Sequence, residues 1–381
     1  MKKQPNVIIA GAGGIAEAAG LILAEWSEAP PAILIGNRTL SRAQELTAWI
    51  QNGTTKPCNI RAFHLPETGV TEEMKTILQT ADVLLDCLPG SLAPRMARLA
   101  RDFQLHYANL TEYVAETNEI IAFTQDASTG FVLQTGLAPG YIDVLANGLF
   151  RQFCRDYGVD RSDNLDMKVG ALTDHAVTPH FYGFTWSPVG VATEYLKDAV
   201  VLRNFAKAAL PALSETGAII IDGIAYEDDL TSGAAADLPD ALSGKVRSLD
   251  YKTLRHPGHY AWVKQQLAVS GSHPDPVAAL QGQMEAQIPH VENDRIILYA
   301  AVEGRDAAGT LRRREIAKKI LPQMVGKHRL RAIQTTTAAP LLQSAQMLLD
   351  TPQRGVIRQS RIDPEQFLNG RFIVSVYGNY P

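Results

Sequence analysis

Largely apolar runs alternate with amphipathic stretches from the start of the chain to Asn109. The apolar runs predict strands at Val7–Ala10, Ala32–Ile35, Asn59–Phe63, Asp82–Leu88 and Leu105–Asn109. The stretches between them predict helices at Ile15–Trp26, Ser41–Ile50, Glu72–Thr80 and Leu92–Asp102. Strands that are apolar on both faces are typical of a parallel sheet covered by helices on both sides. The pattern therefore predicts an α/β fold with a doubly wound parallel sheet.

The rhythm changes after Gly140, where fewer helices separate the strands. The pattern predicts a helix at Asp143–Tyr157, an exposed loop rich in small residues at Thr231–Gly244 and a long apolar helix at Ala332–Leu349. Strands are predicted at Asp166–Ala171, Phe181–Trp186, Ala218–Ile221 and Ile296–Val302. This half of the chain is therefore expected to form a second, mixed α/β (α+β) domain, which a chain of 381 residues also favours.

A glycine motif lies between the first predicted strand and the first predicted helix. The run Gly11-Ala12-Gly13-Gly14-Ile15-Ala16 has the form G-x-G-x-x-A. Gly11 permits a tight turn, Gly13 lets the backbone approach a pyrophosphate, and Ala16 still allows close helix–strand packing. The free N–H groups of the helix N-terminus bind the phosphates, with Ala12, Gly14 and Ile15 alongside them. Strand, motif and helix together indicate a Rossmann dinucleotide site.

The residues after the second predicted strand indicate which dinucleotide binds. An NAD site usually places Asp or Glu there to accept from the ribose 2′-OH, but this chain has Asn37. Arg38, Thr39 and Arg42 offer cations and a hydroxyl to a 2′-phosphate, and the run resembles the NADP-binding run of shikimate dehydrogenases. We therefore expect NADP(H) to be preferred, with NAD(H) as the alternative. The arginines could equally be surface residues at a helix start.

The fourth predicted strand ends at the sheet edge where such folds bind ligands. Leu88 and Pro89 follow that strand and are expected to line the nicotinamide side of the site. Cys87, just before them, is expected to be a buried, inert thiol.

Composition and charge exclude several classes of partner. The formal net charge is −4, which gives no reason to expect a nucleic acid or an anionic membrane as partner. No uncharged apolar stretch reaches the ~20 residues of a membrane span. Three scattered cysteines form no zinc motif and suggest a reducing, cytoplasmic location, and no metal is expected.

Three later segments resemble one family. Gly136–Gly140 reads G-L-A-P-G, Thr185–Gly190 reads T-W-S-P-V-G, and Thr253–His259 reads T-L-R-H-P-G-H. In this order they resemble the saccharopine dehydrogenase family, in particular saccharopine reductases and lysine 6-dehydrogenases. Val189 and Arg203-Asn204-Phe205 depart from the family pattern, which leaves the substrate itself open.

The resemblance implies domains and an activity. It implies a Rossmann domain at 1–140 that is completed by 331–381, a substrate-binding and dimerisation domain at 141–330, and often a homodimer. Gly140 then ends the crossover beside the cofactor. The implied activity is hydride transfer at a C–N bond of an amino-acid-like substrate, run as reductive condensation or as lysine-type dehydrogenation.

The T-L-R-H-P-G-H turn supplies the residues best suited to such a substrate. Arg255 is the natural bidentate partner of an amino-acid carboxylate, although a structural ion pair would use the same residue. His256 and His259 could transfer a proton or simply hydrogen-bond a carboxylate. Glu194 could accept from an ammonium group or act in catalysis.

Three further candidates belong to the substrate side. Asp143 could accept from an ammonium group, although a solvated helix face is the simpler interpretation. Trp186, beside Ser187, could pack against the aliphatic chain of the substrate or against the nicotinamide, or could be an ordinary core aromatic. The leading hypothesis is an NADP(H)-dependent oxidoreductase acting on a C–N bond. The alternative is an NADP(H)-binding sensor or scaffold without turnover.

Overall fold

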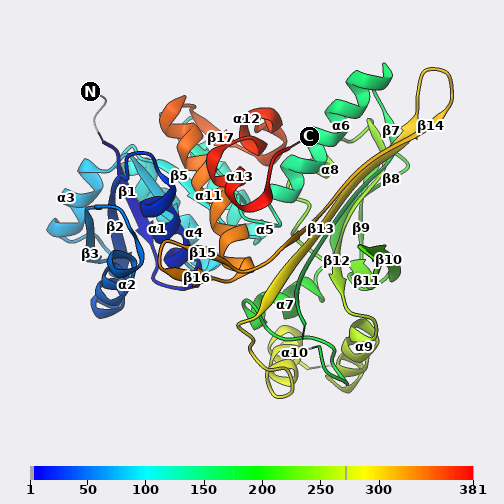
Figure 1. Cartoon of the computed structure of the whole chain (residues 1–381), viewed down its shortest axis with the longest axis horizontal. Helices are drawn as coiled ribbons and strands as arrows, with labels where there is room; N and C mark the ends of the chain where they lie inside the picture. The colour runs from blue at the N-terminus through cyan, green and yellow to red at the C-terminus, as the bar shows by residue number, and fades with distance from the viewer. Residues whose placement is uncertain (1–3, 175, 271–272, 381) are drawn as a thin grey trace. The chain divides into compact units, whose positions relative to one another are not determined.

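The structure is a computed structural model that describes residues 4–174, 176–270 and 273–380. It divides into two compact units (Figure 1). Unit 1 contains the chain up to Tyr141, Gln323–Leu330 and the chain from Gln334 onward. Unit 2 contains Ile142–Pro322 and Arg331–Ile333. The sequence placed the two divisions at 140 and 330. The first stretch of unit 1 ends at Tyr141, and the C-terminal return differs from the expected 331–381, because Gln323–Leu330 belongs to unit 1 and Arg331–Ile333 to unit 2.

Unit 1 is built on a seven-stranded sheet whose pairs are all parallel, in the order β17-β6-β5-β4-β1-β2-β3. Its strands are β1 (Asn6–Ala10), β2 (Ala32–Asn37), β3 (Ile60–His64), β4 (Val83–Asp86), β5 (His106–Asn109), β6 (Gly130–Val132) and β17 (Gly355–Ile357). The chain runs from β1 outward to β3 and then returns to β4 on the other side of β1. The strand order therefore reverses between β1 and β4, where open α/β sheets bind their ligands.

Helices cover both faces of this sheet, as its apolar strands require. They are α1 (Gly14–Trp26), α2 (Leu40–Gly53), α3 (Glu72–Thr80), α4 (Ala93–Asp102, after the 3₁₀ turn Gly90–Leu92) and α5 (Val114–Thr124). Buried residues of α3, α4 and α5 form one core with β1, β4 and β5. On the other face Gly20 of α1 leaves no room for a Cβ beside Ile50 of α2 and Ile9 of β1, so these elements are closely packed.

The C-terminal segment completes unit 1. It contains the hairpin β15 (Gln323–Val325) and β16 (His328–Leu330), and then α11 (Ala332–Asp350) from Gln334 onward. Strand β17, the 3₁₀ turn Gln359–Arg361, α12 (Pro364–Leu368) and α13 (Arg371–Tyr377) follow. Ser344 of α11 shares a hydrogen bond with Thr135 over 2.6 Å, and the rings of Tyr377 and Tyr141 stack at 3.6 Å. No helix in the described part of the chain is long and apolar enough to cross a membrane.

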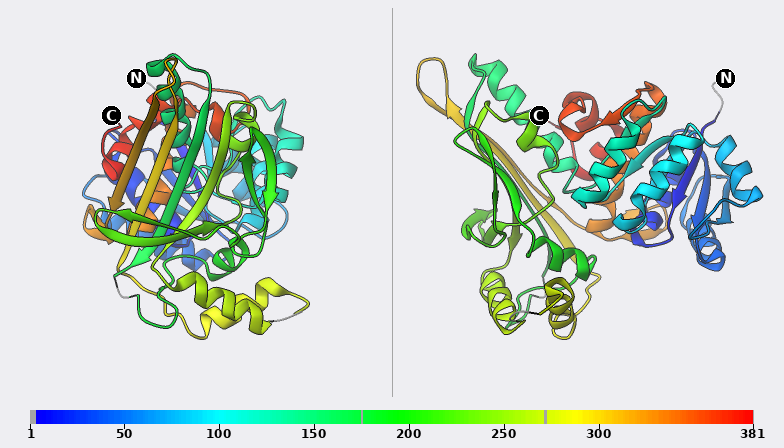
Figure 2. Two further views of the ribbon diagram at one scale, coloured as in Figure 1. Left: turned by 90° about the vertical axis from the view of Figure 1, so that its right-hand side faces the viewer. Right: turned by 180° about the vertical axis from the view of Figure 1, so that it is seen from behind.

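Unit 2 is built on an eight-stranded mixed sheet, whose long strands lie side by side in Figure 2. The order is β10-β11-β12-β7-β13-β14, and the β8–β9 pair joins it at β12. The strands are β7 (Ser162–Thr173), β8 (Ala199–Arg203), β9 (Ala206–Leu210), β10 (Gly217–Ile221), β11 (Ile224–Leu230), β12 (Val246–Arg255), β13 (Asp294–Arg305) and β14 (Leu311–Ile320). The predicted α/β fold with a second, mixed domain is confirmed.

The helices of unit 2 are α6 (Tyr141–Tyr157), α7 (Pro188–Glu194), α8 (Leu238–Ala241), α9 (His259–Ser270) and α10 (Pro276–Glu285). Tyr182, Phe184, Tyr195 and Trp262 belong to an aromatic-rich core that joins α7, α9 and α10. Aromatic rings therefore surround the end of β12, where the T-L-R-H-P-G-H segment passes into α9.

Two predicted secondary-structure elements of unit 2 were wrong. The apolar run Phe181–Trp186 is not a strand: it makes only an isolated bridge from Phe184 to His290, and its rings enter the aromatic core. The segment Thr231–Gly244 is not an exposed loop, because Leu238 and Leu242 are buried and anchor the short helix α8.

Candidate functional site

The glycine turn of unit 1 has the geometry of a phosphate cradle. Gly11 has a φ of +116°, and its N–H donates to the carbonyl of Gly36 over 2.8 Å. A Cβ at Gly11 would lie 2.9 Å from the Cys87 carbonyl oxygen, so the turn itself requires glycine. A Cβ at Gly13 would meet no protein atom within 4 Å. The turn therefore leaves free space above Gly13, at the N-terminus of α1, where the first-turn N–H groups could bind a pyrophosphate.

The predicted residues Ala12, Gly14 and Ile15 are the sequence neighbours of Gly13 in this turn, and the C-terminal segment adds a contact to it. The side-chain amide of Gln334, at the start of α11, donates to the Gly14 carbonyl over 2.9 Å and to Glu17 over 3.3 Å. Gln334 thus fixes the first turn of α1 from a position more than three hundred residues along the chain. No local pattern in the sequence indicates this contact.

The residues expected to select the dinucleotide lie at the end of β2 and the start of α2. The side chain of Asn37 donates to the Thr39 carbonyl over 3.1 Å, and Thr39 is the N-cap residue of α2. Arg38 and Arg42 are exposed, with side-chain accessibilities of 72% and 71%. Arg38 pairs with Glu67 at 2.7 Å and Arg42 with Glu45 at 3.4 Å. Both arginines can therefore reach a ligand at this edge, and the sequence interpretation missed Glu67.

The turn after β4 is fixed by a buried carboxyl group that the sequence interpretation also missed. Asp86, the last residue of β4, accepts from the Tyr107 hydroxyl over 2.7 Å and from the Leu88 N–H over 3.0 Å. Burial raises the pKa of Asp86 to about 6, although both hydrogen bonds act against that shift. The Cys87 N–H donates to the Ala10 carbonyl of β1 over 2.9 Å, and a Cβ at Gly11 would lie 3.5 Å from the Leu88 side chain. Leu88 therefore lies beside the glycine turn, and the contact of Pro89 with a cofactor stays a prediction. Cys87 is half-buried where a buried thiol was expected, and loss of solvation still raises the pKa of its thiol, consistent with an inert cysteine.

The geometry of the turn at Gly136–Gly140 explains why position 140 is a glycine. Its φ is +133°, and a Cβ there would collide with the backbone of Gly136. The Gly136 N–H donates to Pro139, and the Tyr141 N–H donates to Gly136. The compact turn alone therefore requires this glycine, and its contact with a cofactor stays a prediction.

In unit 2, Arg255 ends β12 in a nearly closed environment and is only 1% exposed. Its Nε donates to the Tyr195 hydroxyl over 2.6 Å, its Nη1 to the Leu254 carbonyl over 3.0 Å and its Nη2 to Glu194 over 2.9 Å. Its guanidinium also lies 4.7 Å from the centre of the Tyr182 ring. The predicted carboxylate reader is thus a buried cation whose charge is balanced by Glu194 and two aromatic rings.

His259 belongs to the same cluster. Its Nδ1 faces the His180 carbonyl at 2.6 Å, and its Nε2 faces the Tyr195 hydroxyl at 3.0 Å. A carbonyl can only accept, so Nδ1 carries the proton and Nε2 accepts from Tyr195. Burial, helped by the charge of Arg255, lowers the pKa of His259 to about 3. The imidazole is therefore neutral near pH 7, and Tyr195 connects it to Arg255.

The turn between β12 and α9 is held from β11. Glu227 accepts from the N–H groups of Gly258 and Tyr260, over 3.0 and 2.6 Å. His256 faces the Thr173 carbonyl with its Nε2 at 3.0 Å, outside the Arg255 cluster. The structure therefore separates the two predicted histidines: His259 lies in the cluster, and His256 lies against the end of β7.

The remaining candidates of unit 2 occupy different positions. Ser187 is the N-cap of α7, where its Oγ accepts from the Gly190 N–H over 3.3 Å. Trp186 covers Gly190, which has no room for a Cβ beside the indole. Asp143 is fully buried in α6, so the solvated helix face expected for it is wrong. Glu194 contacts Arg255 directly, whereas His259 is connected to Arg255 through Tyr195. The roles predicted for Ser187, Trp186 and Asp143 stay predictions.

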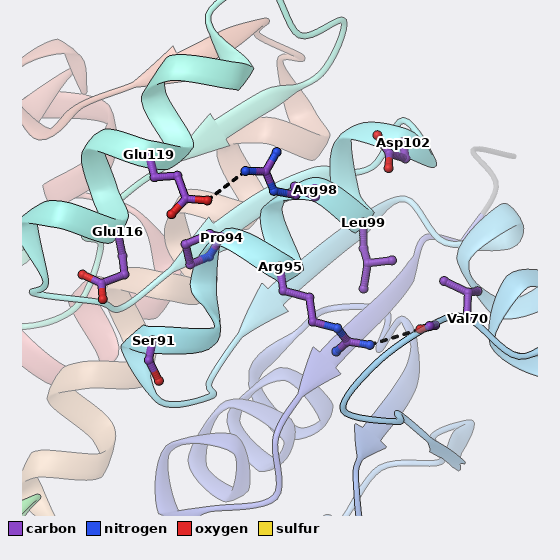
Figure 3. Close-up of a pocket in the computed structure, with 10 residues that line it drawn as sticks. Val70, Ser91, Pro94, Arg95, Arg98, Leu99, Asp102, Glu116 and Glu119 are labelled. Carbon is purple, nitrogen blue, oxygen red and sulfur yellow. Dashed lines mark hydrogen bonds and ion pairs between the residues drawn. The ribbon is translucent and has the colours of Figure 1, made fainter.

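A cleft of about 500 Å³ lies beside helices α4 and α5 of unit 1 (Figure 3). Arg95 and Arg98 of α4, Glu116 and Glu119 of α5, and the Gly69–Val70 turn are among its lining residues. None of the predicted site residues lines it. Within the described residues no group of His, Cys, Asp and Glu side chains could hold a metal ion.

Comparison with known proteins identifies the family. The profile of the saccharopine dehydrogenase NADP-binding domain matches residues 7–133, and that of the saccharopine dehydrogenase C-terminal domain matches residues 136–370. The mitochondrial alpha-aminoadipic semialdehyde synthases of Rattus norvegicus and Mus musculus are each 22% identical, over 205 and 173 residues. These matches cover 54% and 45% of this chain but only 21% and 18% of the synthases.

Solved structures agree on the fold. A saccharopine dehydrogenase (L-Glu forming) from Saccharomyces cerevisiae superposes with a TM-score of 0.76 at 16% identity, covering 98% of both chains. A homospermidine synthase from Legionella pneumophila, in complex with NAD, superposes with a TM-score of 0.66 at 13% identity, covering 99% of this chain and 90% of that one.

The fold and the glycine turn together define a protein of the Rossmann dinucleotide-binding class, and residues 7–133 match an NADP-binding domain profile. More narrowly, the chain belongs to the saccharopine dehydrogenase family, as the three sequence segments predicted.

Proposed function

We propose that this protein is an NADP(H)-dependent oxidoreductase that acts on the C–N bond of an amino acid or of its imine adduct with an aldehyde. The observation that carries the proposal is the open space above Gly13 at the start of α1, in a chain of this family. The names of the similar proteins, saccharopine dehydrogenase and homospermidine synthase, support a substrate with a C–N bond.

The preference for NADP(H) rests on the edge of β2. Asn37 does not repel a phosphate as a carboxylate would, and Arg38 and Arg42 are exposed beside it. A bound nicotinamide would accept or supply the hydride, and the protein would position the carbon and handle one proton. NADP(H) use favours the reductive direction, which joins an amine to an aldehyde.

On the substrate side we assign distinct tasks to the cluster at the end of β12. Arg255 holds the Glu194 carboxylate in place, and its remaining N–H groups could bind a substrate carboxylate. Glu194, whose side chain is 14% exposed, is the acidic group that can accept from a substrate amine. His259 is neutral and hydrogen-bonded through both nitrogens, which suits a positioning residue better than a proton donor. His256 is then the imidazole available for proton transfer, with Trp186, Ser187 and Asp143 as further substrate contacts.

A steady-state assay tests the proposal. NADPH oxidation should be followed with pairs of amino acids and amino-acid semialdehydes, and NADP⁺ reduction with diamino acids. Turnover with one pair would establish the C–N chemistry. Tight NADPH binding without turnover on any pair would instead favour a sensor or scaffold. Assembly as a homodimer and a cytoplasmic location stay predictions, and sedimentation analysis of the purified protein tests the first.

A further inference from the structure

Glu67 is an acidic residue that pairs with Arg38, the residue directly after Asn37. Strands β2 and β3 are paired so that His64 lies opposite Asn37, and the Leu65 N–H donates to the Asn37 carbonyl over 3.0 Å. The chain after β3 therefore leaves the sheet beside the end of β2. Two residues further on, Glu67 accepts from Nη1 of Arg38 over 2.7 Å.

The loop that carries Glu67 is also held at its other end. Arg95, in the first turn of α4, donates from Nη2 to the Gly69 carbonyl over 3.2 Å (Figure 3). Leu65 and Gly69 are thus both tied to the frame of unit 1, and Glu67 lies between them. The side chain of Glu67 is 67% exposed, so a ligand at this edge can reach it.

We propose that Glu67 is a specificity-determining residue that lets the Arg38–Glu67 pair read either dinucleotide. This inference rests on the proposed nicotinamide function. With NAD(H), the pair stays intact and the Glu67 carboxylate accepts from the ribose 2′-OH, a task usually given to an acidic residue at the end of β2. With NADP(H), the 2′-phosphate replaces Glu67 as the partner of Arg38, and the two like charges keep Glu67 at a distance.

The exposure of the pair makes this exchange easy. Ion pairs between well-exposed side chains contribute little to stability, so separating the Glu67 carboxylate from the Arg38 guanidinium costs little free energy. Glu67 should accordingly weaken NADP(H) binding slightly and strengthen NAD(H) binding slightly. The ratio of the two dissociation constants is therefore the quantity that Glu67 controls.

The test compares wild type with Glu67→Gln by titrating each protein with NADPH and with NADH. The variant should bind NADPH about threefold more tightly and NADH about threefold more weakly, so that the NADH-to-NADPH ratio of Kd rises about tenfold. Glu119→Gln is the matched control: Glu119 forms the same kind of exposed pair, with Arg98 at 2.8 Å, and should leave the ratio unchanged.

A rise of less than about threefold in Glu67→Gln, or an equal rise in Glu119→Gln, would overturn the role of Glu67. Neither result would contradict the proposed function, provided that the wild-type protein binds a dinucleotide. A wild-type protein that binds neither NADPH nor NADH would overturn the proposed function and this inference with it.

Discussion

Arg255 and Glu194 form an ion pair 2.9 Å long in which the arginine is 1% exposed and the carboxylate side chain 14%. A buried pair is tolerated only when both charges are balanced and hydrogen-bonded. Here the guanidinium is also bonded to Tyr195 and to the Leu254 carbonyl, and it lies against the ring of Tyr182. Removing either charge would leave the other unbalanced inside unit 2, so each member constrains the other.

The neutral His259 makes the stability of unit 2 dependent on pH. Its pKa is lowered from 6.5 to about 3 in the folded chain, so below pH 6.5 the unfolded chain takes up a proton that the folded chain does not. The stability that this group contributes is present above pH 6.5 and is lost as the pH falls toward 3. At pH 5 the loss is about 2 kcal/mol. Urea unfolding at pH 7.5 and pH 5 should show a smaller loss in His259→Asn than in wild type, and identical losses would contradict the assignment.

Asp86 should act in the opposite direction in unit 1. Burial raises its pKa from 3.8 to about 6, so the folded chain holds this proton more tightly than the unfolded chain. The stabilisation is complete below pH 3.8 and is lost as the pH rises through 6. The amide of Asp86→Asn does not ionise, so the variant does not lose stability through this group as the pH rises. Between pH 4.5 and pH 7.5 its free energy of unfolding should therefore gain about 2 kcal/mol relative to wild type. A constant difference across this range would show that Asp86 ionises normally.

The sequence predicted the parts of the site that depend on local structure. The glycine turn and the Asn37–Arg42 run each lie within one strand–turn–helix unit, where spacing alone defines the geometry. Glu67, Asp86 and Gln334 were missed because their partners lie on other elements: the end of β2, the chain around β5 and the start of α1. Such contacts depend on the order of the strands and on the return of the C-terminal segment.

Short apolar runs also limited what could be predicted from the sequence. Phe181–Trp186 is as apolar as a strand, but its rings fill the core between α7 and α9 and its backbone stays irregular. A Cβ at Gly183 would lie 2.7 Å from Val291, so this loop packs closely without sheet pairing. Periodicity cannot distinguish a buried strand from a buried loop in so short a segment. Helices α9 and α10 were likewise not predicted.

Gly13 and Gly11 should respond differently to alanine. Gly13 has a φ of −96° and free space where a Cβ would lie, so Gly13→Ala should fold with an unchanged melting temperature. A methyl group there would occupy the space expected for the pyrophosphate, and NADPH binding should weaken at least about tenfold, or 1.4 kcal/mol. Gly11→Ala should destabilise unit 1 because its φ is +116° and Cys87 lies against it. Normal NADPH affinity in Gly13→Ala would remove the glycine turn from the cofactor site.

Arg38 should matter far more for NADPH than for NADH, because only NADPH carries the phosphate that would replace Glu67 as its partner. Losing a charge-assisted contact to a phosphate costs about 1.5–3 kcal/mol, so Arg38→Ala should weaken NADPH binding more than about tenfold. NADH lacks the phosphate, and its affinity should stay nearly unchanged. Arg98→Ala removes a comparable exposed cation from α4 and serves as the control in the same titrations. Equal weakening of both dinucleotides by Arg38→Ala would show that Arg38 does not contact the 2′-phosphate.

Arg255→Ala separates substrate binding from structural support. Leaving Glu194 buried without its partner should cost about 3–5 kcal/mol of stability, seen as a lower melting temperature. The double variant Arg255→Ala/Glu194→Gln removes the unbalanced carboxylate and should recover part of that loss. If Arg255 also binds the substrate carboxylate, kcat/KM in this double variant should stay about 2–4 kcal/mol below that of Glu194→Gln alone, mostly through KM. NADPH affinity should change less than about twofold, because the Rossmann site belongs to unit 1. Assays well below the melting temperature decide the matter: a double variant with the KM of Glu194→Gln would leave Arg255 a purely structural role.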